Sequence, residues 1–195
     1  MALALATLLV GCGFHLRGTT GYTFAIHDIN LVARDPYGSL TEDVRQMLER
    51  NNVKITDQAP YTLVLDRKEL DSRTSSYTRS ARTAERELIM TLAYSIRAKA
   101  EGNPTLLENT IEVQRFYTYD GNSMTASDQI ATQTEQEMER EIVQQLAMRL
   151  QAIKPEELAT LAEAAEQKAE LERQRQREAL ERSRQPLQSP LQILK

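Results

Sequence analysis

The sequence predicts an α+β fold, in which a mixed four-stranded sheet has two helices packed on one face (order β-α-β-β-β-α). Two observations predict it: stretches in which apolar and polar residues alternate, as in half-buried strands, and stretches in which apolar residues recur at helical spacing. Glycine, asparagine and proline separate these stretches, as they do in turns. We expect one α+β domain over residues 23–154, followed by a C-terminal tail that is charged and either helical or disordered.

The first strand and the first helix come from the N-terminal part of this domain. The strand is expected over residues 24–32, where the apolar alternation is imperfect. Ser39-Leu40-Thr41-Glu42 has the form of a capping box, in which the Ser39 hydroxyl and the Glu42 carboxylate bind exposed backbone amides at a helix start. A stripe of apolar residues at helical spacing follows, formed by Leu40, Val44, Met47 and Leu48. Asn51-Asn52 is expected to end this helix.

Three further strands and a helix complete the predicted domain. Residues 61–65 are apolar on both faces, which is typical of an interior strand. Residues 88–98 give the clearest alternation, and residues 111–120 form the partner strand after a turn at Gly102-Asn103-Pro104. The last helix carries a narrow apolar stripe and is expected to open near Glu135 and to stop at Pro155; the stripe consists of Met138, Ile142, Val143, Leu146, Leu150 and Ile153.

The composition changes in the tail, residues 155–195. Alanine, glutamate, glutamine, arginine and leucine dominate, and opposite charges are closely interleaved, which favours a single solvated helix. Lys168 and Glu172 interrupt the apolar stripe that Leu158 and Leu161 begin, so the pattern does not predict a long coiled coil. Past Arg184 we expect the proline-containing segment to be disordered.

The N-terminus has the pattern of an export signal that ends in a lipidation site. Residues 1–11 are uncharged and mostly apolar, and Leu9-Val10-Gly11-Cys12 matches the lipobox of bacterial lipoproteins. We expect cleavage before Cys12, acylation of Cys12, and an extended tether over residues 12–22. Because each buried methylene adds about 0.8 kcal/mol, several acyl chains hold a protein firmly at a membrane. No Lys or Arg precedes the apolar run, so we expect the true start codon to lie upstream.

Composition disfavours several classes of function. The formal net charge is −4, which gives no overall basic field for nucleic acid. There are two histidines, one cysteine and no recognisable nucleophile motif, so we expect neither catalysis nor a metal site, and no cofactor apart from the covalent lipid anchor. A lipid-tethered hydrolase stays open as an alternative, and it would require a buried pair of carboxylates in a cleft.

The segment between the second and third predicted strands, residues 73–86, is locally basic. It carries Arg73, Arg79, Arg82 and Arg86 against Glu85 alone. Guanidinium groups bind phosphates through two parallel hydrogen bonds, so a loop of this kind suits phosphate or sugar-phosphate recognition. The alternative is an ordinary charged loop that has no ligand.

Cys12-Gly13-Phe14-His15-Leu16-Arg17-Gly18 resembles the start of mature lipoproteins of the LptE family, which act in lipopolysaccharide assembly. The resemblance covers residues 9–153 and continues through Arg79, Thr83-Ala84-Glu85 and Glu135-Gln136-Glu137-Met138. Gly13, in place of an aspartate after the lipidated cysteine, fits sorting to the outer membrane.

The resemblance implies a non-enzymatic, lipid-anchored protein of the outer membrane that faces the periplasm. Proteins of this family sit as a plug in the lumen of the LptD β-barrel and help deliver lipopolysaccharide to the outer leaflet. Arg79 is the residue carried over for lipopolysaccharide binding, and Arg82, Arg86 and Arg73 join it by proximity. The alternative is a periplasm-facing adaptor lipoprotein of another envelope assembly machine, which would use its charged tail as a partner helix.

Overall fold

The computed structural model describes residues 22–77 and 83–184. The predicted signal peptide, Cys12, Arg79, Arg82 and residues 185–195 lie outside the described residues. The elements follow the order β1 (Asp28–Ala33), α1 (Ser39–Arg50), β2 (Lys54–Ile55), β3 (Tyr61–Tyr77), β4 (Thr83–Ala98), β5 (Thr105–Asp120), α2 (Met124–Gln151) and α3 (Pro155–Arg184).

The strands form one mixed sheet, as the sequence predicts, with the order β2-β1-β3-β4-β5. β1 runs parallel to both β2 and β3, whereas β3, β4 and β5 are antiparallel. The sheet has five strands because the two-residue strand β2 adds to the four that we predicted. A strand of that length carries no alternation, so the sequence pattern could not reveal it.

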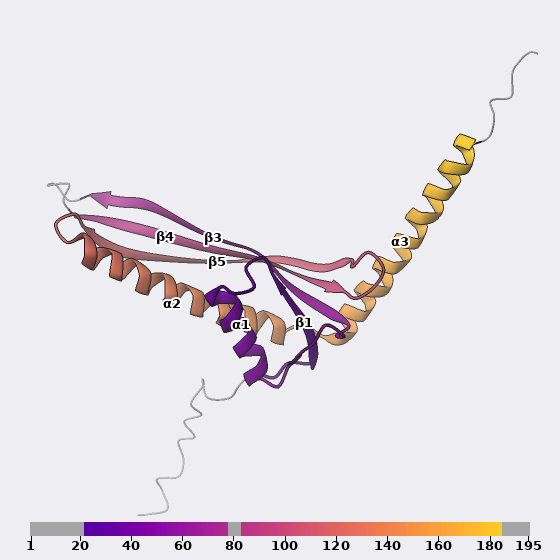
Figure 1. The fold of residues 1–195 in the computed structure, drawn as a ribbon, viewed down its shortest axis with the longest axis horizontal. Coiled ribbons are helices and arrows are strands. Elements are labelled where there is room, and N and C mark those ends of the chain that lie inside the picture. Colours follow the sequence, from indigo (N-terminus) through magenta and orange to yellow (C-terminus); the bar gives the residue numbers. More distant parts are fainter. Residues whose placement is uncertain (1–21, 78–82, 185–195) are drawn as a thin grey trace, which may run out of the picture.

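The core lies between the sheet and the two helices α1 and α2, which pack on the same side of it (Figure 1). The predicted alternation of β4 is confirmed, because each residue of its core-facing row is at most 3% exposed: Leu88, Met90, Leu92, Tyr94 and Ile96. The predicted stripe of α1 is buried as well. Burying one such side chain stabilises the fold by about 1.5–3 kcal/mol, so this face holds the domain together.

The start of α1 differs from the predicted capping box. Gly38 occupies the N-cap position, no side chain caps the helix, and Ser39 is already its first helical residue. The Ser39 hydroxyl instead donates a 2.8 Å hydrogen bond to Glu139 of α2. A Cβ at Gly38 would lie 2.4 Å from a carboxylate oxygen of Asp35, so another residue there would require the Asp35 side chain to move. The bond from Ser39 therefore joins two helices and does not cap one.

Two predicted boundaries are also wrong. The first strand begins at Asp28, although Phe24 and Ile26 before it are buried at 6% and 8% exposure. α2 begins at Met124, well before the predicted start near Glu135. The prediction missed its first turns because they carry too few apolar residues to form a helical stripe. Ser127 anchors this part: it is 3% exposed, and its hydroxyl accepts a 2.9 Å hydrogen bond from the amide of Asp120.

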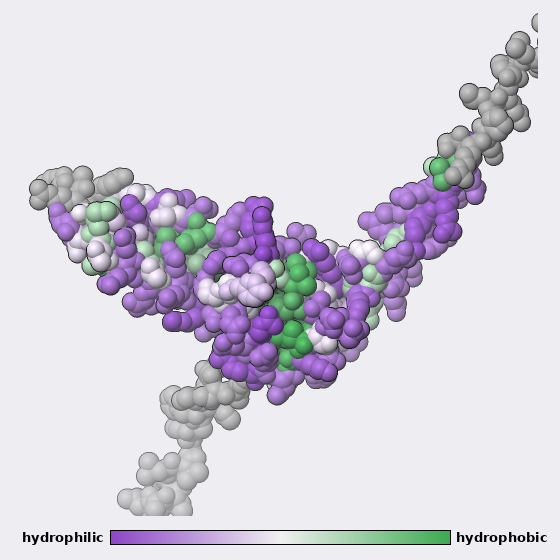
Figure 2. All heavy atoms as spheres, in the orientation of Figure 1, coloured by the Kyte–Doolittle hydropathy of each residue, from purple (hydrophilic) through white to green (hydrophobic). Residues whose placement is uncertain are grey.

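The tail forms a helix, as expected, through Arg184. Pro155 ends the preceding helical pattern and is also the first residue of α3, a position that tolerates proline because its N–H would be unpaired in any case. Leu158 is 1% exposed and belongs to the core, and the C-terminal half of α3 runs away from the sheet (Figure 1). Hydrophilic residues cover most of α3 and much of the visible surface (Figure 2). No described helix is both long and apolar enough to cross a membrane.

Candidate functional site

The basic segment is a long antiparallel hairpin, which corrects the predicted loop over residues 73–86. β3 extends to Tyr77 and β4 begins at Thr83, so only residues 78–82 connect them. Arg73 pairs with Glu87, and Thr74 pairs with Arg86. The segment is polar on both faces, and the sequence therefore lacks the alternation that would have revealed a strand.

The register places Arg73 and Arg86 on opposite faces of the sheet. Side chains alternate between the two faces along a strand, and Arg86 is the neighbour of Glu87, the cross-strand partner of Arg73. Arg86 therefore lies on the side that carries the core and α2, whereas Arg73 lies on the uncovered side. The two guanidinium groups cannot hold one anion together from a single face.

Arg73 is engaged by a buried carboxylate. Its Nε donates a short hydrogen bond to Glu87, which is 4% exposed, while the Arg73 side chain is 66% exposed. Phe116 of β5 is the partner of Glu87 on the other side. The hydrogen bond from Arg73 lowers the pKa of Glu87, which burial would otherwise raise, and the same bond raises the pKa of Arg73. Arg73 thus serves as the counter-ion of Glu87.

Arg86 makes a different contact. Its guanidinium lies 4.1 Å from the ring centroid of Tyr119, at cation-π distance. The N-terminus of α2 lies at this same end of the sheet (Figure 1), and it has no side-chain cap and no acidic residue in its first turn. Both features favour the binding of an anion at the start of α2, because unpaired N–H groups at a helix start carry partial positive charge.

A second buried carboxylate links three elements of the domain, α1, α2 and β3. Glu139 of α2 is 8% exposed; it accepts a 2.5 Å bond from Lys68 Nζ of β3 as well as the bond from Ser39. Glu87 and Glu139 are the two buried carboxylates of the described residues, and each is neutralised by its own cation. They lie on opposite sides of the sheet, so they do not form the carboxylate pair that a hydrolase would need. The described residues also contain no cluster suited to a metal ion.

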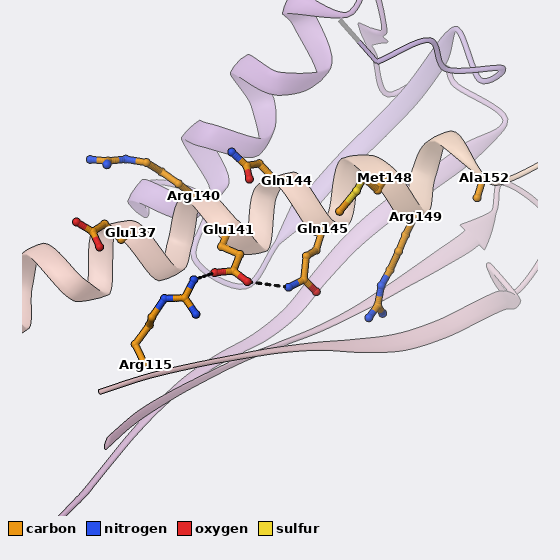
Figure 3. A pocket seen from close by; sticks show the side chains of 9 residues that line it. All are labelled: Arg115, Glu137, Arg140, Glu141, Gln144, Gln145, Met148, Arg149 and Ala152. Atoms are coloured by element: carbon orange, nitrogen blue, oxygen red, sulfur yellow. Dashed lines mark hydrogen bonds and ion pairs between the residues drawn. The ribbon is translucent and has the colours of Figure 1, made fainter. Parts of the chain in front are cut away.

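A shallow groove of about 720 Å³ runs beside α2, at the edge formed by β5 (Figure 3). Two of its arginines are paired: Arg115 binds Glu141, and Arg149 donates to the carbonyl oxygen of Thr110 at 2.8 Å. Arg140 projects from the other side of α2. No histidine, cysteine or serine lines this groove. Its hydrogen bonds attach α2 to the edge strand.

Comparison with known proteins decides the family. A family model described as LptE, lipopolysaccharide-assembly, matches residues 26–150. The chain belongs to the LptE family. The LPS-assembly lipoprotein LptE of Pectobacterium atrosepticum is 35% identical over 161 residues, covering 78% of this chain and 84% of that protein. LptE of Yersinia pestis is 32% identical over 158 residues, covering 77% and 73%.

Solved structures of lipoproteins share the fold of this LptE-family chain. The rare lipoprotein B of Shewanella oneidensis matches with a TM-score of 0.51 and 28% identity, over 74% of this chain and 98% of that one. A lipoprotein B of Nitrosomonas europaea matches in fold with a TM-score of 0.59 at 18% identity, over 72% and 92%. The family match covers β1 to α2 almost completely and leaves α3 outside.

Proposed function

We propose that the protein is a lipoprotein of the outer membrane, anchored through an acylated Cys12, that occupies the lumen of an LptD β-barrel and supports its assembly. In this role it helps deliver lipopolysaccharide to the outer leaflet without catalysing a reaction. Membership of the LptE family supports the process, and the shape of the sheet supports a position inside another protein.

The observation that carries the proposal is the uncovered extension of the sheet. β1 pairs with β3 only up to Leu65, so within the described residues β3 has no neighbour on that side from Arg67 to Tyr77. β5 forms the other edge. Phe116 is 52% exposed on the face turned away from the helices. Exposed strand edges invite pairing with other chains unless something shields them.

A barrel lumen suits such a surface. The extension exposes charged and hydroxyl side chains on both edges, and the lumen of an outer-membrane barrel is polar and filled with water. Enclosure in a barrel would shield the two edges without requiring an apolar interface. The elongated sheet with α2 along it has the shape of a plug (Figure 1).

Lipopolysaccharide contact is proposed for the hairpin end, through Arg79, Arg82, Arg86 and Arg73. Phosphate groups of lipid A are the chemistry that these arginines fit. Because Arg73 and Arg86 lie on opposite faces, one phosphate would be held by one of them together with Arg79 or Arg82. Arg86 is the better placed of the two, since it lies on the side of the sheet that carries α2, whose start is uncapped.

Co-purification tests the proposal. The full-length tagged chain, extracted from its own membranes in mild detergent, should recover an LptD-type barrel in equal amount. Peptidoglycan or periplasmic proteins in place of a barrel would contradict the proposal and favour the adaptor alternative. Mass spectrometry of the same material should find acyl chains on Cys12, and an unmodified cysteine thiol would contradict the anchor.

A further inference from the structure

α3 consists of a docked half and a projecting half. The docked half begins with Leu158, and one side of the helix faces the domain through Ala162, Ala165 and Ala169, which are partly buried. Arg173 closes this contact, because its Nη1 donates a 2.7 Å hydrogen bond to Glu101 in the β4–β5 turn. Beyond Arg173 the helix continues away from the sheet (Figure 1). The domain thus contacts the first half of α3, and the second half projects from it.

Charge is segregated along this helix. Residues 155–172 contain six glutamates and one lysine, whereas residues 173–184 contain five arginines and two glutamates. The chain as a whole is acidic, with a net charge of −4, so the projecting half is a local region of opposite sign. A basic arm on an acidic body favours a negatively charged binding partner.

Beyond the contact with the domain, the same side of α3 carries a further arginine. Arg177 lies one turn beyond Arg173, on nearly the same side of the helix. It is exposed and forms no ion pair with another described residue. Arg175 lies about 200° away from Arg173, on the far side. The pair between Arg173 and Glu101 shows what this side binds, which is a surface carboxylate.

The pattern fits a protein surface better than a bilayer. A helix that lies on a membrane has one apolar face and one basic face. In α3 the exposed leucines Leu171 and Leu180 are nine residues apart and lie on roughly opposite sides at about 100° per residue. Arg175 and Arg177 likewise lie on different sides. No apolar face is available for insertion into lipid.

We propose that the projecting half of α3 is a docking arm that binds a carboxylate-bearing protein surface next to the β4–β5 turn, with Arg177 as its central contact. The proposal rests on the proposed function only for the identity of the partner, which is the barrel protein. α3 lies outside the part of the chain that matches the family, so this contact is an addition to the shared domain.

Site-specific photo-crosslinking tests the side of the helix that is engaged. A photoreactive residue replaces Gln174, which lies about 60° from Arg177 around the helix, or Ala179, which lies about 160° from it, so that all arginines are kept. In cells with the full-length chain, the probe at position 174 should crosslink to the barrel several times more than the probe at position 179. Equal crosslinking, or none while the barrel still co-purifies, would overturn the docking arm and leave the proposed function intact.

Charge reversal tests the chemistry. In the purified complex, Arg177→Glu should abolish the crosslink from position 174 and speed salt-induced release of α3 from the barrel by about fivefold, as measured by a fluorophore at position 174. Arg175→Glu should change the release rate less than about twofold. A Lys substitution of the crosslinked acidic residue should restore the crosslink to Arg177→Glu. Crosslinks between two copies, or Arg177-dependent binding to phosphatidylglycerol vesicles, would overturn the proposal. Failure to recover any barrel would contradict both this inference and the proposed function.

Discussion

Replacing Leu158 with alanine tests whether α3 is an integral part of the domain. Leu158 lies beyond the matched family region, yet it is 1% exposed and belongs to the same hydrophobic cluster as Leu150. Leu→Ala substitutions in cores cost about 2–5 kcal/mol, through lost burial and the remaining cavity. Leu158 lies at the end of the core, where α3 can partly close the cavity, so we expect the lower half of that range, about 2–3 kcal/mol.

Leu161→Ala is the matched control, because Leu161 is on the same helix, three residues later, and is 42% exposed. It should lower the free energy of unfolding by less than about 0.5 kcal/mol. Urea denaturation of the purified full-length chain, followed by circular dichroism, measures both variants. The thermal midpoint of Leu158→Ala should fall by roughly 4–12 °C, at about 2–4 °C per kcal/mol for a domain of this size. Equal, small effects of the two substitutions would refute the docking of α3.

Three further predictions concern the site and the buried ion pairs. Arg79→Glu should weaken binding of purified lipopolysaccharide by about 1–3 kcal/mol, measured by calorimetry, and unchanged affinity would reduce the hairpin tip to a solvated turn. Because the folded-state pKa of Glu87 is lowered, its pairing with Arg73 stabilises the fold above the ordinary glutamate pKa of about 4.3 and is lost as pH falls through the lowered value. Denaturation at a series of pH values should therefore show that the free energy of unfolding falls less at acid pH in Glu87→Gln than in the unsubstituted protein. An identical fall at acid pH in both proteins would contradict the pairing. Glu139→Ala should destabilise by about 1–3 kcal/mol because Lys68 loses its partner, whereas the exposed Glu137→Ala should stay within about 0.5 kcal/mol.

The sequence predicts the fold where one face of an element is buried. The core-facing row of β4 and the stripe of α1 are read directly from apolar spacing, because burial imposes that spacing. The polar halves of β3 and β4 escape prediction, since neither face of the hairpin extension near Arg73 is apolar. The same reason hides the first turns of α2. Backbone pairing that continues beyond the core leaves no hydrophobic pattern in the sequence.

The sequence shows that the segment over residues 73–86 is basic, but it does not show on which face of the sheet each arginine lies. The four arginines stand out by their charge, but the face on which a side chain lies follows from the register, and a shift of one residue reverses it. An apolar alternation fixes the register of β4 at Leu88 and beyond, and none reaches Arg86. Glu87 and Glu139 could not be singled out either, because only the tertiary structure shows which of the many glutamates are buried.

We propose above that this LptE-family chain helps deliver lipopolysaccharide to the outer leaflet. Quantifying lipopolysaccharide on intact cells, by surface labelling before and after depletion of the protein, tests that claim most directly. We predict that surface lipopolysaccharide falls in step with depletion while total synthesis continues, and that the full-length chain restores it. An undiminished surface level in fully depleted cells would contradict the account.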